Sequence, residues 1–183
     1  RYADRVTPIY LDLNQPNSIY AAAANAQDVD VVINNAGILN KAAILDPAAI
    51  ESLQNEFDIN VFGLLRMAQA FAPLLKNNGG GAFVQLNSIA SLRCVPAFAT
   101  YAASKAAAYS LTQAIRHELG QQGTVVLSVH PGPVDTDIAK SIGVSDSDPP
   151  SVVAQAIIKA LELGELHVFP DSRAQQIGRE YKH

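Results

Sequence analysis

The chain has 183 residues, of which 49% are hydrophobic and 16% are charged, with a formal net charge of −4. This balance excludes a disordered chain and predicts a single globular domain over residues 1–183. Lys and Arg form no cluster, so a nucleic-acid partner has no electrostatic support.

Cys94 is the only cysteine, which excludes a disulfide framework and a thiolate metal site. The four histidines lack ligand spacing, so we expect no metal. The most apolar stretch, 61–75, is interrupted by Arg66 and Gln69 and is too short to span a membrane. No signal peptide is recognised, and we expect a cytoplasmic protein.

Short apolar runs alternate with longer helical patterns along the chain. The predicted strands are 6–11, 29–33, 82–86, 124–130 and 166–169. The predicted helices are 18–26, 47–76 (with a break inside it), 100–119, 151–163 and 172–181. Ser18 and Asp46 are the expected caps of the first two helices, and the β-branched strand 29–33 is expected to be buried on both faces. Such alternation predicts an α/β fold with a parallel sheet between helices.

Unusual polar clusters follow the predicted strands. Asp12 ends the first strand, Asn34-Asn35-Ala36-Gly37 follows the second, Ser88 follows the third, and Pro131-Gly132 follows the fourth. Because ligands of parallel α/β sheets bind beyond the carboxyl ends of the strands, these clusters predict a ligand site at that edge.

Tyr101 and Lys105 are four residues apart at the start of a predicted helix, so their side chains share one face. An ammonium beside a phenol favours the phenolate, so we expect the pKa of Tyr101 to fall and the side chain to exchange protons. Ser88, 13 residues earlier, can hydrogen-bond the same substrate oxygen. Taken alone, the pair favours a surface lysine and an amphipathic tyrosine, because any alanine-rich helix can contain this spacing by chance.

Five motifs occur together in a fixed order. They are NNAG at 34–37, DINVFG at 58–63, LNSIAS at 86–91, YAASK at 101–105 and PGPVDT at 131–136. In order and spacing the sequence resembles the short-chain dehydrogenase/reductase family. The resemblance implies a doubly wound parallel sheet of the Rossmann type, an NAD or NADP cofactor, and a homodimer or homotetramer.

The resemblance assigns four catalytic residues. Tyr101 would be the general acid/base for a small carbonyl or alcohol substrate, and Lys105 would lower its pKa and bind the nicotinamide ribose. Ser88 would hold and polarise the substrate oxygen. Asn60 would anchor a water that continues the proton relay.

The resemblance also implies a set of cofactor-binding residues: Asp12, Leu13, Asn34, Ala36, Gly37, Tyr101, Lys105, Pro131, Gly132, Val134 and Thr136. Asp12 would accept from the adenine amino group, although it could equally cap the helix that follows. Asn34 is expected to tie neighbouring strands and line the adenosine side, and a Cβ at Gly37 would crowd the cofactor. Pro131-Gly132 would wall the nicotinamide site, although a plain turn also uses these residues.

One family motif has no counterpart here, the glycine-rich turn that binds pyrophosphate at a helix N-terminus. The segment 6–11 matches the family's third strand, so the first two βα units are missing and we expect a domain incomplete at its N-terminus. In such a domain the segment 6–11 would have no neighbouring strand. Arg1 would favour NADP over NAD. The short polar lid segment 137–150 would leave an open site.

Three functions remain open on the sequence. The first is an oxidoreductase that moves a hydride between NADP, or alternatively NAD, and a carbonyl/alcohol pair. The second is a noncatalytic Rossmann-like remnant that lacks the phosphate-binding turn. The third is a lyase or epimerase with the same tyrosine and lysine. In the first case the apolar helices 47–76 and 100–119 would form the oligomer contact.

Overall fold

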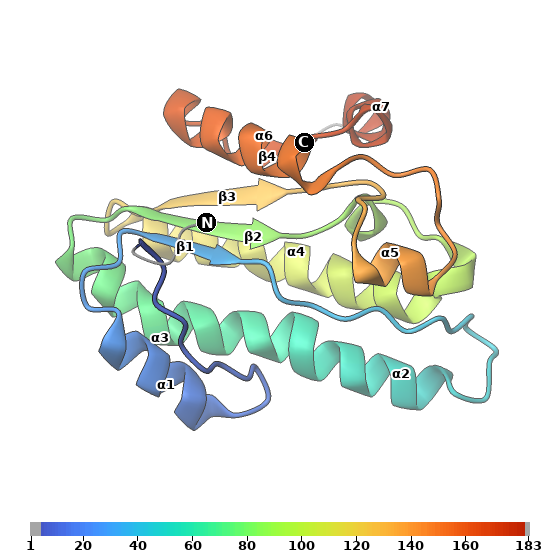
Figure 1. Ribbon diagram of the computed structural model, residues 1–183, viewed down its shortest axis with the longest axis horizontal. Coiled ribbons are helices and arrows are strands. Elements are labelled where there is room, and N and C mark those ends of the chain that lie inside the picture. The colour runs from blue at the N-terminus through green and yellow to red at the C-terminus, as the bar shows by residue number, and fades with distance from the viewer. Residues whose placement is uncertain (1–4, 182–183) are drawn as a thin grey trace.

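The computed structural model describes residues 5–181, and a parallel sheet is its centre (Figure 1). The strands are β1 (Val31–Asn34), β2 (Ala82–Leu86), β3 (Val125–Val129) and β4 (His167–Val168). They are hydrogen-bonded in the order β1-β2-β3-β4, and every neighbouring pair is parallel. The predicted α/β class with a parallel sheet is therefore confirmed.

Helices cover the two faces of the sheet. They are α1 (Pro16–Asn25), α2 (Ala49–Glu56), the π-helical turn η2 (Phe57–Phe62), α3 (Gly63–Asn77), α4 (Ala99–Gly120), α5 (Asp137–Ser141), α6 (Pro150–Leu163) and α7 (Ser172–Glu180). Figure 1 shows α1, α3 and α4 on one side of the sheet, α6 on the other, and α5 beyond the carboxyl ends of the strands. Among residues 5–181, no helix is both long and apolar enough to cross a membrane.

The core has two layers because successive side chains of a strand point to opposite faces. Phe83 belongs to the layer against α1, α3 and α4, where Leu64 and Leu75 are also fully buried. Val84 and Leu127 belong to the layer against α6. All five residues of β2 are buried, so the central strand is covered on both faces.

β1 departs from the prediction. Val31 and Ile33 are 41% and 54% exposed, so the expectation that this strand is buried on both faces is wrong. The reason is the position of α6, which packs on β3 and β4 and leaves this face of β1 uncovered by the part of the chain described here.

The segment 6–11 forms no strand, which contradicts the prediction. Val6 and Tyr10 are 61% and 70% exposed. A strand needs a neighbour to satisfy its backbone groups, and β1 pairs only with β2 within residues 5–181. Pro8 also lacks an N–H with which to join a ladder.

Two predicted caps are wrong. The first helix begins at Pro16, where proline suits the first helical turn, and the Ser18 hydroxyl instead donates to the carbonyl oxygens of Asp12 and Gln15. Asp46 forms a turn by accepting from the N–H of Ala48 at 2.9 Å, and α2 begins only at Ala49.

The other boundaries agree with the predictions to within two residues, and β2 matches its predicted bounds. The long helix predicted over 47–76 is not broken, but its helical type changes to a π-helical turn in η2, between α2 and α3. Such turns occur frequently at functional sites.

Candidate active site

The predicted catalytic side chains meet at the carboxyl ends of β1 and β2. Ser88 lies two residues beyond β2, Tyr101 and Lys105 lie in the first turns of α4, and Asn60 lies in η2. Residues from three separate segments therefore converge on the edge where ligands of parallel sheets bind.

Ser88 is held by the turn that follows β2. Its hydroxyl oxygen accepts from the N–H of Ala90 at 3.1 Å, and its carbonyl oxygen accepts from the hydroxyl of Ser91. Nδ1 of the fully buried His130 lies 3.0 Å from Oγ of Ser91. The Ser88 hydroxyl keeps its hydrogen for a further acceptor because it uses only a lone pair in this turn.

Tyr101 is half-buried beside two groups of the site. Burial raises the pKa of its phenol to about 12, a hydrogen bond with the Ser88 side chain lowers it, and the charge of Glu56 raises it. The expected fall in the pKa of Tyr101 is therefore not found. Lys105 lies close, with Nζ 5.8 Å from the ring centroid, but desolvation of the phenolate outweighs what this ammonium contributes.

Lys105 is only 6% exposed. Its Nζ donates to the carbonyl oxygen of Leu86, the last residue of β2, at 2.9 Å. Burial lowers the pKa of this ammonium to about 8. Leu86 takes one of its three N–H donors, which leaves donors for a ligand at the same edge.

Asn60 joins the loop after β1 to α4. Its Oδ1 accepts from the N–H of Ile38 at 2.9 Å, and its Nδ2 donates to the Ile38 carbonyl at 3.0 Å and to Oγ of Ser104 at 2.9 Å. The buried Asn60 amide thus binds both backbone groups of Ile38, in the loop after β1. The water that the family resemblance assigns to Asn60 stays a prediction.

Gly37 faces the same groups. A Cβ added there would lie 3.0 Å from Oδ1 of Asn60 and 3.5 Å from Nζ of Lys105. A side chain at residue 37 would therefore be tight against Asn60, and the glycine lets the backbone lie close to the lysine. Ala36, before it, is exposed.

Two further predicted residues are Asn34, at the end of β1, and Pro131, just beyond β3. Asn34 is buried, and its Nδ2 donates to Oε1 of Gln85 on β2 at 2.6 Å, so it ties neighbouring strands as expected. The carbonyl oxygen of Pro131 accepts from the N–H of Ile89 at 3.0 Å, which connects the turn after β3 to the turn that carries Ser88.

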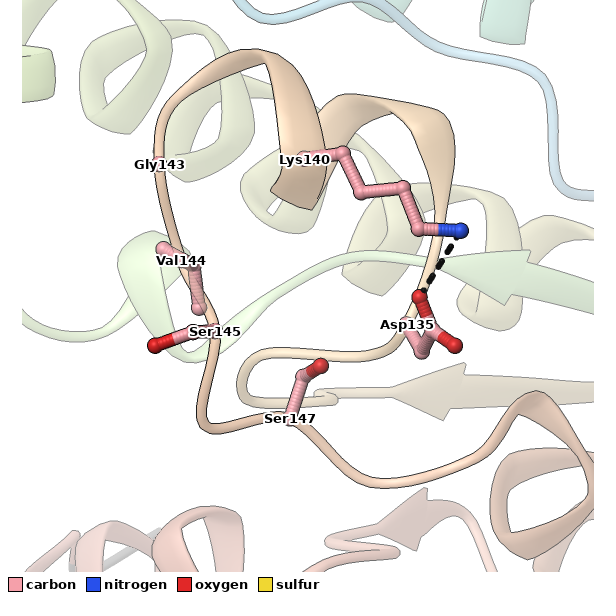
Figure 2. A pocket seen from close by; sticks show the side chains of 6 residues that line it. All are labelled: Asp135, Lys140, Gly143, Val144, Ser145 and Ser147. Atoms are coloured by element: carbon pink, nitrogen blue, oxygen red, sulfur yellow. Dashed lines mark ion pairs between the residues drawn. The ribbon is translucent and has the colours of Figure 1, made fainter.

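Val134 and Thr136 shape the segment beyond β3. Val134 forms a parallel bridge with Asp148, and Thr136 caps α5 by accepting from the N–H of Ala139 at 3.3 Å. The expected lid segment thus contains a short helix. A pocket of about 470 Å³ lies at this place. Asp135 and Lys140 are among its lining residues and form an ion pair of 3.1 Å, which is marked in Figure 2.

Asp12 contacts its sequence neighbours, and Leu13 packs in the core. The Asp12 carboxylate accepts from the N–H of Asn14 at 2.9 Å and from Nε2 of Gln15 at 2.8 Å, but the N-cap of α1 is Gln15, so Asp12 does not cap this helix. Leu13 is a core residue, and its carbonyl oxygen accepts from Arg66 at 2.8 Å. Cofactor binding by either residue stays a prediction.

Sequence reasoning missed two buried carboxyl groups. Glu56 is fully buried one helical turn before Asn60, its Oε1 accepts from the N–H of Asn40 at 2.7 Å, and burial raises its pKa. Asp171 caps α7 and also contacts Gly132. The i, i+4 spacing to Asn60 and the Asp-Ser start of the last helix were the available signals.

Comparison with known proteins identifies a family for this chain. Residues 1–146 match the family model described as short chain dehydrogenase. The chain belongs to the short-chain dehydrogenase family. It is 33% identical over 135 residues to an uncharacterized oxidoreductase of Staphylococcus aureus strain N315 and 32% identical over 136 residues to one of Staphylococcus saprophyticus. Each of the two alignments covers 73% of this chain and 58% of the relative's length.

Solved short-chain dehydrogenases share the fold. One from Burkholderia cenocepacia J2315, in complex with NADP, superposes with a TM-score of 0.90 at 35% identity, over 96% of this chain and 73% of the other. One from Streptomyces avermitilis gives a TM-score of 0.86 at 27% identity, over 98% and 75%. These solved structures also support the predicted Rossmann-type architecture.

Arg1, expected to favour NADP, lies outside residues 5–181. Within those residues no group of three or more His, Cys, Asp or Glu side chains could hold a metal ion.

Proposed function

We propose that the full-length protein is an NADP-dependent oxidoreductase, with NAD as the alternative cofactor, that interconverts a small carbonyl compound and its alcohol. The observation that carries the proposal is the meeting of Ser88, Tyr101 and Lys105 at the carboxyl end of β2. A remnant without activity would have no need of a buried lysine beside a tyrosine.

The fit of a nicotinamide dinucleotide rests on Gly37 and Lys105. A Cβ at Gly37 would meet Oδ1 of Asn60 at 3.0 Å and Nζ of Lys105 at 3.5 Å, so the backbone of residue 37 packs against the ammonium that would face the ribose. Lys105 would hold the ribose hydroxyls, and the turn 131–136 would wall the nicotinamide. When bound, the cofactor supplies or accepts the hydride. The NADP in the Burkholderia cenocepacia relative supports the same choice here.

Tyr101 is the group that exchanges the proton. Because burial raises the pKa of its phenol to about 12, the side chain is protonated at neutral pH, the form that a proton donor needs. Ser88, which shares a hydrogen bond with this phenol, would donate to the same substrate oxygen and polarise the carbonyl. Lys105 would orient the ribose and stabilise negative charge on the phenol oxygen.

A panel of aliphatic and aromatic aldehydes and ketones, assayed with NADPH and with NADH, tests the proposal on the full-length protein. We expect turnover of at least some small carbonyls and a higher kcat/KM with NADPH. Failure of both dinucleotides to bind would refute the proposal. A strong preference for NADH would remove only the choice of NADP.

A further inference from the structure

We propose that Asp171 is a positioning residue that fixes the turn 131–133 against α7 and so sets the wall of the cofactor site. The inference rests on the proposed function, because the turn matters for catalysis only if a dinucleotide lies against it. No motif in the sequence assigns such a role to Asp171.

The contacts of the Asp171 carboxylate carry the inference. Oδ2 accepts from the N–H of Gly132 at 2.7 Å, and Oδ1 accepts from the N–H of Ala174 at 2.8 Å. The side chain is only 3% exposed. One carboxylate thus joins two segments that are 39 residues apart, the turn after β3 and the first turn of α7.

Gly132 lies unusually close to this carboxylate. A Cβ at Gly132 would approach Oδ1 of Asp171 to 2.6 Å, closer than real contacts allow. The carboxylate cannot swing aside without giving up one of its two backbone partners. Position 132 therefore needs glycine because Asp171 occupies the space beside it.

The number of acceptors explains why a carboxylate is needed. Each carboxylate oxygen takes one backbone N–H, one from the turn and one from the helix. An asparagine has one carbonyl oxygen, and its NH₂ group would face an N–H of the same polarity. A serine can cap α7, because serine is as good an N-cap as aspartate, but it has no second oxygen for Gly132.

The turn transmits its position to the catalytic serine. The carbonyl oxygen of Pro131 accepts from the N–H of Ile89, the residue after Ser88. A shift of Gly132 would therefore move the cofactor wall and the turn that presents the Ser88 hydroxyl together. This makes Asp171 a link between the C-terminal helix and the site.

The test compares Asp171→Ser and Asp171→Asn with the wild-type full-length protein. Asp46→Asn is the matched control, since Asp46 also accepts a backbone N–H before a helix but lies in the turn before α2. Pro131 and Pro133 carry no amide hydrogen, so Gly132 provides the only exchangeable amide in 131–133. The hydrogen-exchange rate of the Gly132 amide, measured without cofactor, therefore reports its hydrogen bond to Asp171 independently of activity.

We expect the Gly132 amide to exchange at least about ten-fold faster in both Asp171 variants, and the Kd for NADPH to rise by roughly ten-fold. The Asp46 variant should match the wild type in both. A merely capping role predicts that Asp171→Ser keeps the wild-type exchange rate and Kd, and that result would overturn the inference. If the wild type binds neither NADPH nor NADH, the proposed function fails first and this inference fails with it.

Discussion

The ammonium of Lys105 donates to the carbonyl oxygen of Leu86 at 2.9 Å, and this bond fixes α4 against the end of the central strand. It places the lysine at the sheet edge and holds the helix that carries Tyr101 in register with the turn that carries Ser88. The cost is a buried charge, which is expressed in the pKa of the lysine.

The buried ammonium predicts a pH-dependent stability. Burial lowers the pKa of Lys105 from 10.5 to about 8, so the folded state binds fewer protons than the unfolded state between those values. The loss of folding stability caused by burying this charge is full below pH 8 and becomes smaller as the pH rises. In urea unfolding, the free energy of unfolding of the wild type should rise by about 2 kcal/mol relative to that of Lys105→Met between pH 7 and pH 9.5. Lys159 is exposed on α6, and Lys159→Met should show no such trend. A difference between the wild type and Lys105→Met that stays constant with pH would contradict the prediction.

Gly37→Ala should weaken cofactor binding. The new methyl group would press on Oδ1 of Asn60 at 3.0 Å and occupy space in front of Lys105. We expect the Kd for NADPH, measured by fluorescence titration, to rise about ten-fold or more, and stability to fall by roughly 1–3 kcal/mol. Gly120→Ala is the control, since a Cβ there meets nothing within 4 Å. Equal NADPH affinity in both variants would remove Gly37 from the site.

Asn60→Leu should destabilise the fold through the loop after β1. The change strands the N–H and the carbonyl of Ile38, both now bound by the amide, and deprives Ser104 of a donor. Two unsatisfied backbone groups cost about 2–6 kcal/mol, to be measured by chemical denaturation. Asn17→Leu, exposed on α1, should change stability by less than about 0.5 kcal/mol. A loss below about 1 kcal/mol for Asn60→Leu would show that the clamp is not needed.

The residues near the site differ in how far the sequence predicts them. β2 matched its predicted bounds because a mostly apolar run, interrupted only by Gln85, is buried on both faces. The Tyr101–Lys105 pair was predictable because helical spacing alone brings the side chains together. The raised pKa of Tyr101 was not, since it depends on burial by segments remote in sequence.

The remaining differences have the same origin in tertiary packing. Local sequence gives no sign that α6 lies over β3 and β4 and leaves Val31 and Ile33 exposed. The contact between Asp171 and Gly132 spans 39 residues, so no local pattern announces it. A cap at Asp171 was readable from its Asp-Ser start, but its second partner was not.

The full-length protein should be a homodimer or homotetramer. The prediction rests on the apolar helices α2, α3 and α4 and on η2, and Ile50 of α2 and Phe62 of η2 remain 74% and 45% exposed. Size-exclusion chromatography with light scattering measures the mass directly. A single species with the mass of one chain at micromolar concentration would contradict it.

The most direct test of the proposed chemistry is single-turnover reduction by Tyr101→Phe, with NADPH affinity measured in parallel. The variant loses the proton donor and keeps the ring, so we predict a rate about 10²- to 10⁴-fold lower at nearly unchanged Kd. Tyr20→Phe, the same change on the exposed face of α1, should react at the wild-type rate. Wild-type turnover in Tyr101→Phe would contradict the assignment of the phenol as proton donor.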